Sequence, residues 1–278
     1  MNDFRPGRYQ ALPPIVKNLI IINVIMVLLQ YILATTFHVD LQRYLGLHYF
    51  RSDLFRPWQL LTHIFMHGSP MDLSGTLVHI FSNMFALWMF GSILENRWGP
   101  KRFLIFYIIC GIGAALFYIA TQAVQYEPIY KTFLAFQSSP TLDHFQQFIK
   151  QNDLPADAAF TRAWESDPGN TFLPQIAVRD YGKYVNAMFN SPMVGASGAV
   201  YGILFAFGYL FPNTELMLIF PPIPIKAKWV VTAYAAIELY SAWQNSPGDP
   251  VAHFAHLGGM LVAFILLKIW QQNRKRFY

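Results

Sequence analysis

Two side chains that can do chemistry stand inside apolar segments of the chain. Ser197 begins the apolar segment Ser197–Phe211, and His256 lies about one and a half helical turns into Val251–Trp270. A polar or ionisable group inside a membrane-type segment is costly and marks a functional site by default. A hydroxyl beside an imidazole indicates acyl transfer through a serine nucleophile, because an alcohol is a weak nucleophile until a base takes its proton.

Small residues predict that these two segments pack against each other. Gly198, Gly202 and Ala206 recur every four residues in one segment, as Gly259 and Ala263 do in the other. Faces of this kind let two helices approach closely in lipid, which brings the hydroxyl within hydrogen-bond reach of the imidazole. Taken singly, the serine is explained by a bond to the carbonyl four residues earlier, and the histidine by an interhelical bond. Together, at a similar depth in the membrane, the serine and the histidine favour a catalytic role.

Another apolar segment supplies two more polar side chains. His79 and Asn83 are four residues apart and therefore share one helix face. Donors aimed at a developing oxyanion, beside the backbone N–H of Ser197, are a requirement of acyl transfer, each lowering the barrier by roughly 3–4 kcal/mol. We expect Tyr201, one turn beyond the serine, to pack against the imidazole and hold its orientation, although a tyrosine that only fills the core fits the pattern as well.

The elements that must position these residues are membrane helices. The chain is 54% hydrophobic, 17% aromatic and only 13% charged over 278 residues, whereas a soluble domain carries about a quarter charged residues. Six apolar stretches approach the ~20 residues that span a bilayer, and the first is too long to be a removable signal peptide. We expect an all-α membrane protein with helices at Ile15–Phe37, Leu77–Leu94, Phe103–Val124, Ser197–Phe211, Trp229–Trp243 and Val251–Trp270.

The placement of charges predicts the orientation. With both termini inside, the inner segments are rich in Lys and Arg and poor in acids, which is the positive-inside bias. The net charge of +5 and the pI of about 9.2 then follow from topology and not from nucleic-acid binding. With the compact size, this favours a bacterial inner membrane and cytoplasmic termini. The inner cations are Arg5, Arg8, Lys17, Arg97, Lys101, Arg102, Lys226, Lys228, Lys268, Arg274, Lys275 and Arg276.

Two outer segments are long. Val39–Thr76 is rich in aromatic residues, so we expect it to lie partly in the interfacial zone. Gln125–Pro192 is polar, and we expect an extramembrane insertion, at the mouth of the catalytic cavity, within a single domain of residues 1–278. Its expected helices are Leu142–Gln151 and Ala156–Trp164, capped by Thr141 and by Asp153 or Asp157. Its expected core, or substrate-binding surface, comprises Phe133, Phe136, Phe145, Phe148, Phe160, Trp164 and Phe172.

These residues resemble those of the rhomboid intramembrane serine proteases, over about residues 14–267. The resemblance implies a six-transmembrane-helix bundle with an outer-side insertion between helices 3 and 4, where the family often has a short connection. The motifs that carry it are Gly195-Ala196-Ser197-Gly198 with Tyr201-Gly202, His253-Phe254-Ala255-His256-Leu257-Gly258-Gly259, His79-x-x-x-Asn83-Met84 and Gly91-x-x-Leu94-Glu95-x-Arg97-x-Gly99.

The resemblance also implies the role of each site residue. Ser197 is the nucleophile, His256 the general base and acid, and His79 and Asn83 the oxyanion donors, with no acidic third member. Supporting roles fall to Tyr201, His253, Gly195 and Gly198, and structural roles to Glu95, Arg97 and Gly259, with Glu95 and Arg97 paired near the inner surface.

The implied function is cleavage of transmembrane protein substrates near their outer end, in contact with membrane lipid and without a cofactor, metal ion or nucleic-acid partner. One alternative is a catalytically idle rhomboid-like protein that binds membrane clients. Another is a metal enzyme, because His63-x-x-x-His67 and His253-x-x-His256 are spaced like metal-binding histidine boxes. The sequence shows no supporting carboxylate cluster for these histidines, which disfavours the metal enzyme.

Overall fold

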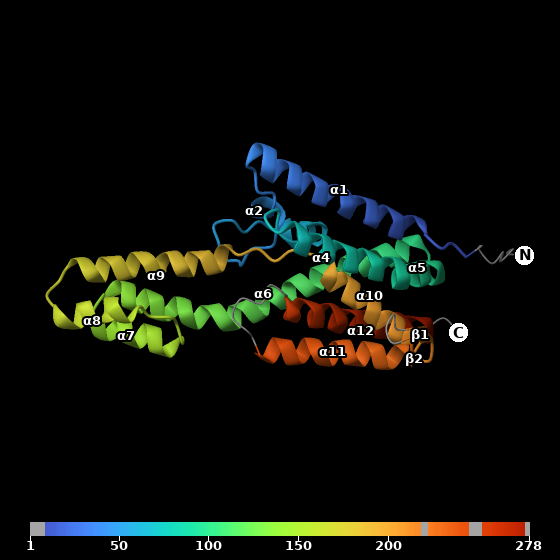
Figure 1. The fold of residues 1–278 in the computed structure, drawn as a ribbon. Coiled ribbons are helices and arrows are strands. Elements are labelled where there is room, and N and C mark those ends of the chain that lie inside the picture. The colour runs from blue at the N-terminus through green and yellow to red at the C-terminus, as the bar shows by residue number, and fades with distance from the viewer. Residues whose placement is uncertain (1–8, 218–221, 245–251, 276–278) are drawn as a thin grey trace, which may run out of the picture. The chain divides into compact units, whose positions relative to one another are not determined.

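The computed structural model describes residues 9–217, 222–244 and 252–275, with side chains up to residue 272. Arg5, Arg8, Val251 and Arg276, which entered the expectations above, lie outside these residues. In chain order the elements, labelled in Figure 1, are α1 (Pro14–Phe37), α2 (Gln42–Leu45), α3 (Gln59–Thr62), η1 (His63–Phe65), α4 (Leu73–Ala86), η2 (Leu87–Gly91), α5 (Ser92–Trp98), α6 (Pro100–Ser138), α7 (Leu142–Gln151), α8 (Ala158–Ser166), α9 (Phe172–Asn190), α10 (Ser197–Leu210), β1 (Glu215–Met217), β2 (Pro224–Lys226), α11 (Ala227–Gln244) and α12 (His253–Lys275).

All six expected apolar stretches are helical where the structure describes them, except for Phe211 and Ala252 at their ends. Four described helical segments are long and apolar enough to cross a membrane: Pro14–Phe37, Leu73–Trp98, Pro100–Ser138 and His253–Gln272. Helix α10 is apolar but only 14 residues long, so the count of six membrane spans stays a prediction. The two three-residue strands were not expected; they pair antiparallel, with Glu215 opposite Lys226.

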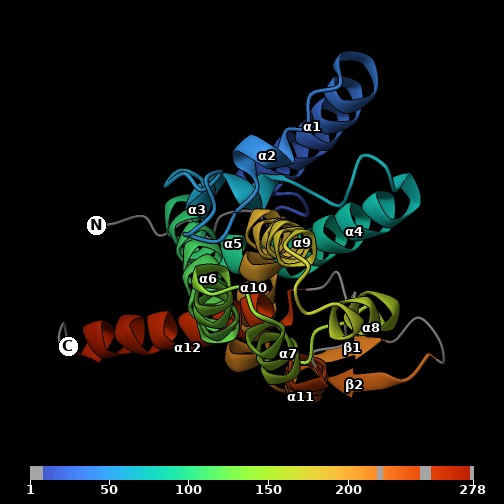
Figure 2. The ribbon, with the colours of Figure 1, turned by 90° about the vertical axis from the view of Figure 1, so that its left-hand side faces the viewer.

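The chain forms two compact units. Unit 1 contains residues 1–47, 56–118 and 192–278, and unit 2 contains residues 48–55 and 119–191. Within unit 1, α10 packs against α4, η2, α11 and α12, and both Figure 1 and Figure 2 draw it beside α12. Because α10 is apolar on all sides, it can be buried all round. Its buried residues are Gly198, Ala199, Val200, Gly202, Ile203, Leu204, Ala206, Phe207 and Gly208.

Glycines bring α10 and α12 into backbone contact. A Cβ atom on Gly259 would lie 1.9 Å from the carbonyl oxygen of Gly198, which is too short for a real side chain, so only glycine fits there. A Cβ on Gly202 would lie 3.1 Å from the carbonyl oxygen of Gly259 in α12, and 2.8 Å from Cβ of Cys110 in α6. The expected close packing of the two small-residue faces is confirmed, and Cys110 is a buried residue of this core.

The Glu95 carboxylate holds the start of α1. Its two oxygens accept the backbone N–H groups of Ile15, at 3.0 Å, and of Val16, at 2.8 Å. The first N–H groups of a helix have no intrahelical acceptor and attract negative charge, so a buried carboxylate fits there. The expected pairing of Glu95 with Arg97 is wrong: among the described residues no ion pair joins them, and Arg97 is exposed.

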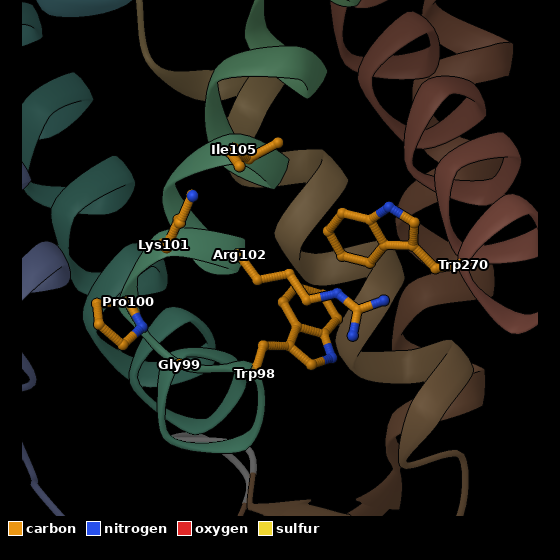
Figure 3. A pocket seen from close by; sticks show the side chains of 7 residues that line it. All are labelled: Trp98, Gly99, Pro100, Lys101, Arg102, Ile105 and Trp270. Atoms are coloured by element: carbon orange, nitrogen blue, oxygen red, sulfur yellow. The ribbon is translucent and has the colours of Figure 1, made fainter. Parts of the chain in front are cut away.

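A cavity of about 430 Å³ lies where α5 gives way to α6, beside the C-terminal part of α12 (Figure 3). The guanidinium of Arg102 lies 4.1 Å from the ring centroid of Trp270, and the Trp98 and Trp270 rings meet edge to face at 5.6 Å. Tryptophan and basic side chains gather in this way at a membrane–water interface.

Unit 2 has an aromatic core of its own, built by α7, α8, α9 and the end of α6 (Figure 1). Helix α7 has the predicted bounds, and Thr141 caps it by accepting the N–H of His144 at 3.3 Å. Asp157, not Asp153, caps α8. Of the expected aromatic set, Phe133, Phe136, Phe145, Phe148 and Trp164 are buried, Phe160 is partly buried, and Phe172 is 69% exposed.

Candidate active site

A short loop places Ser197 at the first position of α10. Two backbone bonds between Met193 and Leu47, of 2.8 and 2.9 Å, hold the loop, and the N–H of Gly195 donates to the carbonyl of His63 at 3.0 Å. Gly195 has φ of +128°, which favours glycine. A Cβ there would lie 3.1 Å from Nε2 of His79, so glycine also makes room for that ring.

The serine and the histidine meet as the sequence predicts. Oγ of Ser197 and Nε2 of His256 are 2.8 Å apart, within hydrogen-bond distance. The serine comes from α10 and the histidine from α12, the two helices joined at Gly198 and Gly259. His256 is only 6% exposed, and Ser197 is half-buried.

Tyr201 lies flat against the imidazole of His256. The ring centroids are 4.1 Å apart and the planes are 7° from parallel. This is the packing expected from its place one turn beyond Ser197. The stack leaves Nε2 facing the serine and limits the tilt of the ring.

Glu238 on α11 is a site residue that sequence reasoning missed. Its Oε2 lies 2.9 Å from Nδ1 of His256 and 2.6 Å from Nδ1 of His253, and its Oε1 accepts the hydroxyl of Tyr201. The resemblance implied a dyad with no acidic third member, yet a carboxylate lies beside its base. The signal was present, because Glu238 is the only charged residue of the apolar stretch Trp229–Trp243, and such a residue is functional by default.

His253 contacts the carboxylate of Glu238 and lies edge-on to the ring of His256. Its ring centroid lies 6.3 Å from that of His256, with the planes nearly perpendicular at 89°. Its Nδ1 makes the 2.6 Å contact to Glu238. This geometry agrees with the supporting role expected for His253, which stays a prediction.

His79 is held with one ring nitrogen turned toward the loop before Ser197. Its Nδ1 accepts the backbone N–H of Gly68 at 3.3 Å. In a neutral imidazole the other nitrogen then carries the proton, so Nε2, the atom near Gly195, is a donor. Asn83 is buried, and its Nδ2 donates to the carbonyl of His79 at 2.8 Å, which uses one of its two N–H bonds.

The histidine-box alternative does not form as its spacing suggested. His63 bonds through Nδ1 to the carbonyl of Gln59 at 2.9 Å, and His67 bonds through Nε2 to Oδ1 of Asn23 at 2.8 Å. Burial lowers the pKa of His63 to about 4 and that of His67 to about 3. Both are therefore neutral at physiological pH.

The described residues do contain one group whose atoms lie close enough to share a metal ion. It consists of Glu238, His253 and His256, with the potential ligand atoms within 4.8 Å of one another. It contains a single carboxylate, and not the carboxylate cluster whose absence from the sequence disfavoured a metal enzyme. In addition, the 2.6 Å between Nδ1 of His253 and Oε2 of Glu238 is a direct hydrogen-bond distance, and ligands at 2.0–2.2 Å from a tetrahedral ion stand farther apart.

Comparison with known proteins finds rhomboid proteins. Similar relatives are the RHOMBOID-like protein 12, mitochondrial, of Arabidopsis thaliana, 26% identical over 227 residues, and the Rhomboid protein 1, mitochondrial, of Saccharomyces cerevisiae, 25% identical over 207 residues. The matches cover 81% and 71% of this chain but 51% and 40% of those proteins, so the chain spans about half their length. Both are mitochondrial by name, which gives the expected bacterial membrane no support.

A model of the rhomboid domain matches residues 55–135 and 172–272, which is more than half of the chain. The match includes all the site residues discussed above and omits residues 136–171, where α7 and α8 lie. With its apolar helices, the chain is an integral membrane protein that belongs to the rhomboid family.

Proposed function

We propose that the chain is an intramembrane serine endopeptidase that cleaves transmembrane segments near their outer end. The observation that carries this proposal is the 2.8 Å contact between Oγ of Ser197 and Nε2 of His256. A weak alcohol nucleophile needs a base within such reach before it can attack a carbonyl. Membership of the rhomboid family supports the same reaction.

In the proposed reaction, Nε2 of His256 takes the hydroxyl proton while Oγ of Ser197 bonds to the carbonyl carbon of the scissile peptide. The tetrahedral intermediate collapses when His256 gives that proton to the leaving amine, which breaks the C–N bond and leaves an acyl ester on Ser197. His256 next takes a proton from water, and the hydroxide attacks the ester. The proton returns to Oγ as the new carboxylic acid leaves.

Three donors are proposed to stabilise the oxyanion. Nε2 of His79 is a donor near Gly195, and the second amide N–H of Asn83 is not used by its bond to the His79 carbonyl. The third is the N–H of Ser197, because α10 begins there and a helix leaves its first N–H groups without intrahelical acceptors. Donors fixed before the reaction stabilise charge without reorganisation.

The proposed substrate is a membrane-spanning protein segment that unwinds into an extended strand. A peptide bond inside a regular helix is closed to attack, so Gly, Pro or polar residues near the outer end of the segment favour cleavage. By its resemblance to the family, the site takes a small residue before the scissile bond. Polar groups at the dyad imply access for water, since such groups are tolerated at membrane depth where they line a cavity. We propose that both termini lie on the inner side.

A fluorophosphonate probe tests the nucleophile directly. We expect purified wild-type protein in detergent to be labelled once per chain at Ser197, because the probe reacts only with a serine that a base activates. Mass spectrometry of the labelled peptide identifies the residue. Ser197→Ala is the control and should remain unlabelled.

The same measurement decides the alternative of an idle, client-binding relative. A folded wild-type protein that neither reacts with the probe nor cleaves a reporter with a Gly- and Pro-containing transmembrane segment would contradict the proposal. Labelling at another serine would contradict the assignment of Ser197.

We propose that unit 2 selects substrates and takes no part in the chemistry. Its core is independent of the dyad residues, all of which belong to unit 1. Replacing residues 130–180 by a short Gly/Ser linker should leave probe labelling of Ser197 and cleavage of a generic unstable transmembrane reporter within about threefold of wild type. The preference among reporters that differ only in their outer extramembrane sequence should be lost. Competition between such reporters measures this preference.

A surface variant separates recognition from folding of unit 2. Phe172 is 69% exposed, so Phe172→Ser alters the surface of unit 2 without removing a core residue. Loss of probe labelling in a folded deletion variant would show instead that unit 2 holds the active site together.

A further inference from the structure

A buried carboxylate stands behind the base of the dyad. Glu238 is 5% exposed, and its Oε2 lies 2.9 Å from Nδ1 of His256, the ring nitrogen opposite the one that faces Ser197. The Nδ1–H of His256 is not aligned for a regular hydrogen bond to this oxygen. The pair nevertheless lies at ion-pair distance, so Ser197, His256 and Glu238 follow one another as nucleophile, base and acid.

The surroundings of Glu238 are built around its charge. The other buried residues of α11 are Ala227, Val231 and Ala242, so Glu238 is the one polar member of an apolar stripe. Burying an unpaired charge is strongly unfavourable, and here Tyr201, His253 and His256 surround the carboxylate. A polar network of this kind, kept in an apolar core, indicates a function besides packing.

We propose that Glu238 is a positioning residue that fixes the tautomer and orientation of His256, so that the dyad works as a serine–histidine–glutamate triad. This inference rests on the proposed protease function. The carboxylate favours the tautomer with the proton on Nδ1, which leaves the Nε2 lone pair to take the proton of Ser197. When His256 becomes charged during the reaction, the negative charge of Glu238 stabilises it, more strongly in a low-dielectric site than in water.

Tyr201 contacts both the imidazole of His256 and the carboxylate of Glu238. Its ring stacks on His256, and its hydroxyl donates to Oε1 of Glu238. Meanwhile, His253 donates its Nδ1–H to Oε2, the oxygen that faces His256. A carboxylate has about four lone-pair sites, so it can accept all three donors. These contacts hold the carboxylate at the back of the imidazole.

Glu238→Gln is the main test, because glutamine keeps the shape and removes the charge. Its amide can present an N–H to Nδ1 of His256 and so favour the tautomer whose Nε2–H cannot accept a proton. In serine proteases the equivalent acid-to-amide change costs about 10⁴ in kcat. Here the Glu238 carboxylate is not aligned with the Nδ1–H of His256, and it also accepts from Tyr201 and His253. We therefore expect a smaller effect, with kcat lowered about 10²-fold and KM unchanged. The rate of fluorophosphonate labelling should fall in parallel.

Two other variants of the network make the test specific. Glu238→Asp keeps the charge on a shorter side chain and should recover at least a tenth of the wild-type kcat. Tyr201→Phe keeps the ring on His256 but removes the hydroxyl, so it should lower the labelling rate several-fold, less than Glu238→Gln. Should Glu238→Gln fail to fold, Glu238→Asp and Tyr201→Phe both reacting at the wild-type rate would overturn the inference.

Glu95→Gln is the matched control. Glu95 is also a buried carboxylate of unit 1, 2% exposed, but it contacts the start of α1 and not the dyad. We expect its replacement to lower thermal stability and to leave kcat per labelled site unchanged. If Glu95→Gln reduced kcat as much as Glu238→Gln does, loss of any buried charge would explain the effect and the inference would fail.

A chelator separates the proposed role from metal binding by Glu238, His253 and His256. Wild-type turnover should be unchanged after treatment with EDTA, and loss of turnover that Zn²⁺ restores would overturn the inference. Failure of the protease proposal itself looks different, because wild-type protein would then show neither labelling nor cleavage. If the wild type does label and cleave, kcat of folded Glu238→Gln within threefold of wild type removes Glu238 from the mechanism.

Discussion

Replacing Ser197 by alanine is expected to abolish cleavage, with kcat lowered by about 10⁶-fold, as when the nucleophile of a serine protease is removed. His256→Ala should have a comparable effect, because a serine without its base is not activated. Ser197 and His256 act as one unit through their 2.8 Å contact, so the double variant should be no less active than either single variant. Cleavage of a transmembrane reporter in detergent or liposomes measures the effect.

Both variants should stay folded, which thermal unfolding checks. Alanine in place of Ser197 removes one oxygen from a half-buried site. In His256→Ala, Glu238 keeps its contacts with Tyr201 and His253. Turnover above a few per cent of wild type in Ser197→Ala would refute the assignment of the nucleophile.

His79→Ala and Asn83→Ala are expected to give the next largest losses, about 10²–10³-fold in kcat for each donor to the oxyanion. We expect the loss to be larger for His79. Its Nδ1 accepts the N–H of Gly68, so the N–H at Nε2 is left for the oxyanion. Asn83 uses one N–H on the His79 carbonyl, and only the other remains for the oxyanion. The kcat and KM for a transmembrane reporter measure both effects.

A structural role for Asn83 gives the opposite pattern. If Asn83→Ala leaves kcat unchanged and lowers the melting temperature, Asn83 serves only to hold its helix. For a true donor, binding of the probe before reaction should change little, since the oxyanion exists only after attack. Ser82→Ala is a matched control, because Ser82 is exposed and makes its own bond to the same His79 carbonyl.

Hydrophobic patterning predicted the apolar helices of unit 1, because each must bury or present apolar surface over a length set by the bilayer. The short helices α2, α3 and η1 were not predicted. The meeting of Ser197 with His256 followed from small residues at four-residue spacing. The start of α10 at Ser197 was also predicted, whereas α12 begins at His253 and not at Val251. Glu238 was missed because the same patterning classed Trp229–Trp243 simply as apolar. One charged residue hardly changes the mean hydropathy of such a stretch, although it changes the chemistry that the helix can support.

The ends of helices in unit 2 were harder to predict. The third apolar helix was expected to end at Val124, yet α6 runs through Pro128 and continues to Ser138. Proline removes one backbone hydrogen bond and bends a helix, but Phe133 and Phe136 beyond it are buried in the core of unit 2. Tertiary packing of this kind overrides a local signal. Helix α9 was not predicted either. Its sequence is mixed in polarity, and the residues that it packs against are distant in the chain.

Because Gly198 and Gly259 are in contact, backbone atoms alone set the distance between the helices that carry the nucleophile and the base. Side chains between two helices can change rotamer and let the helices drift, whereas two backbones in contact cannot approach further, and close packing resists compression. The distance between the reacting atoms should therefore be insensitive to the lateral pressure of the bilayer. A thicker or thinner membrane then changes how a substrate enters and unwinds, while the reach of the hydroxyl to the imidazole stays the same.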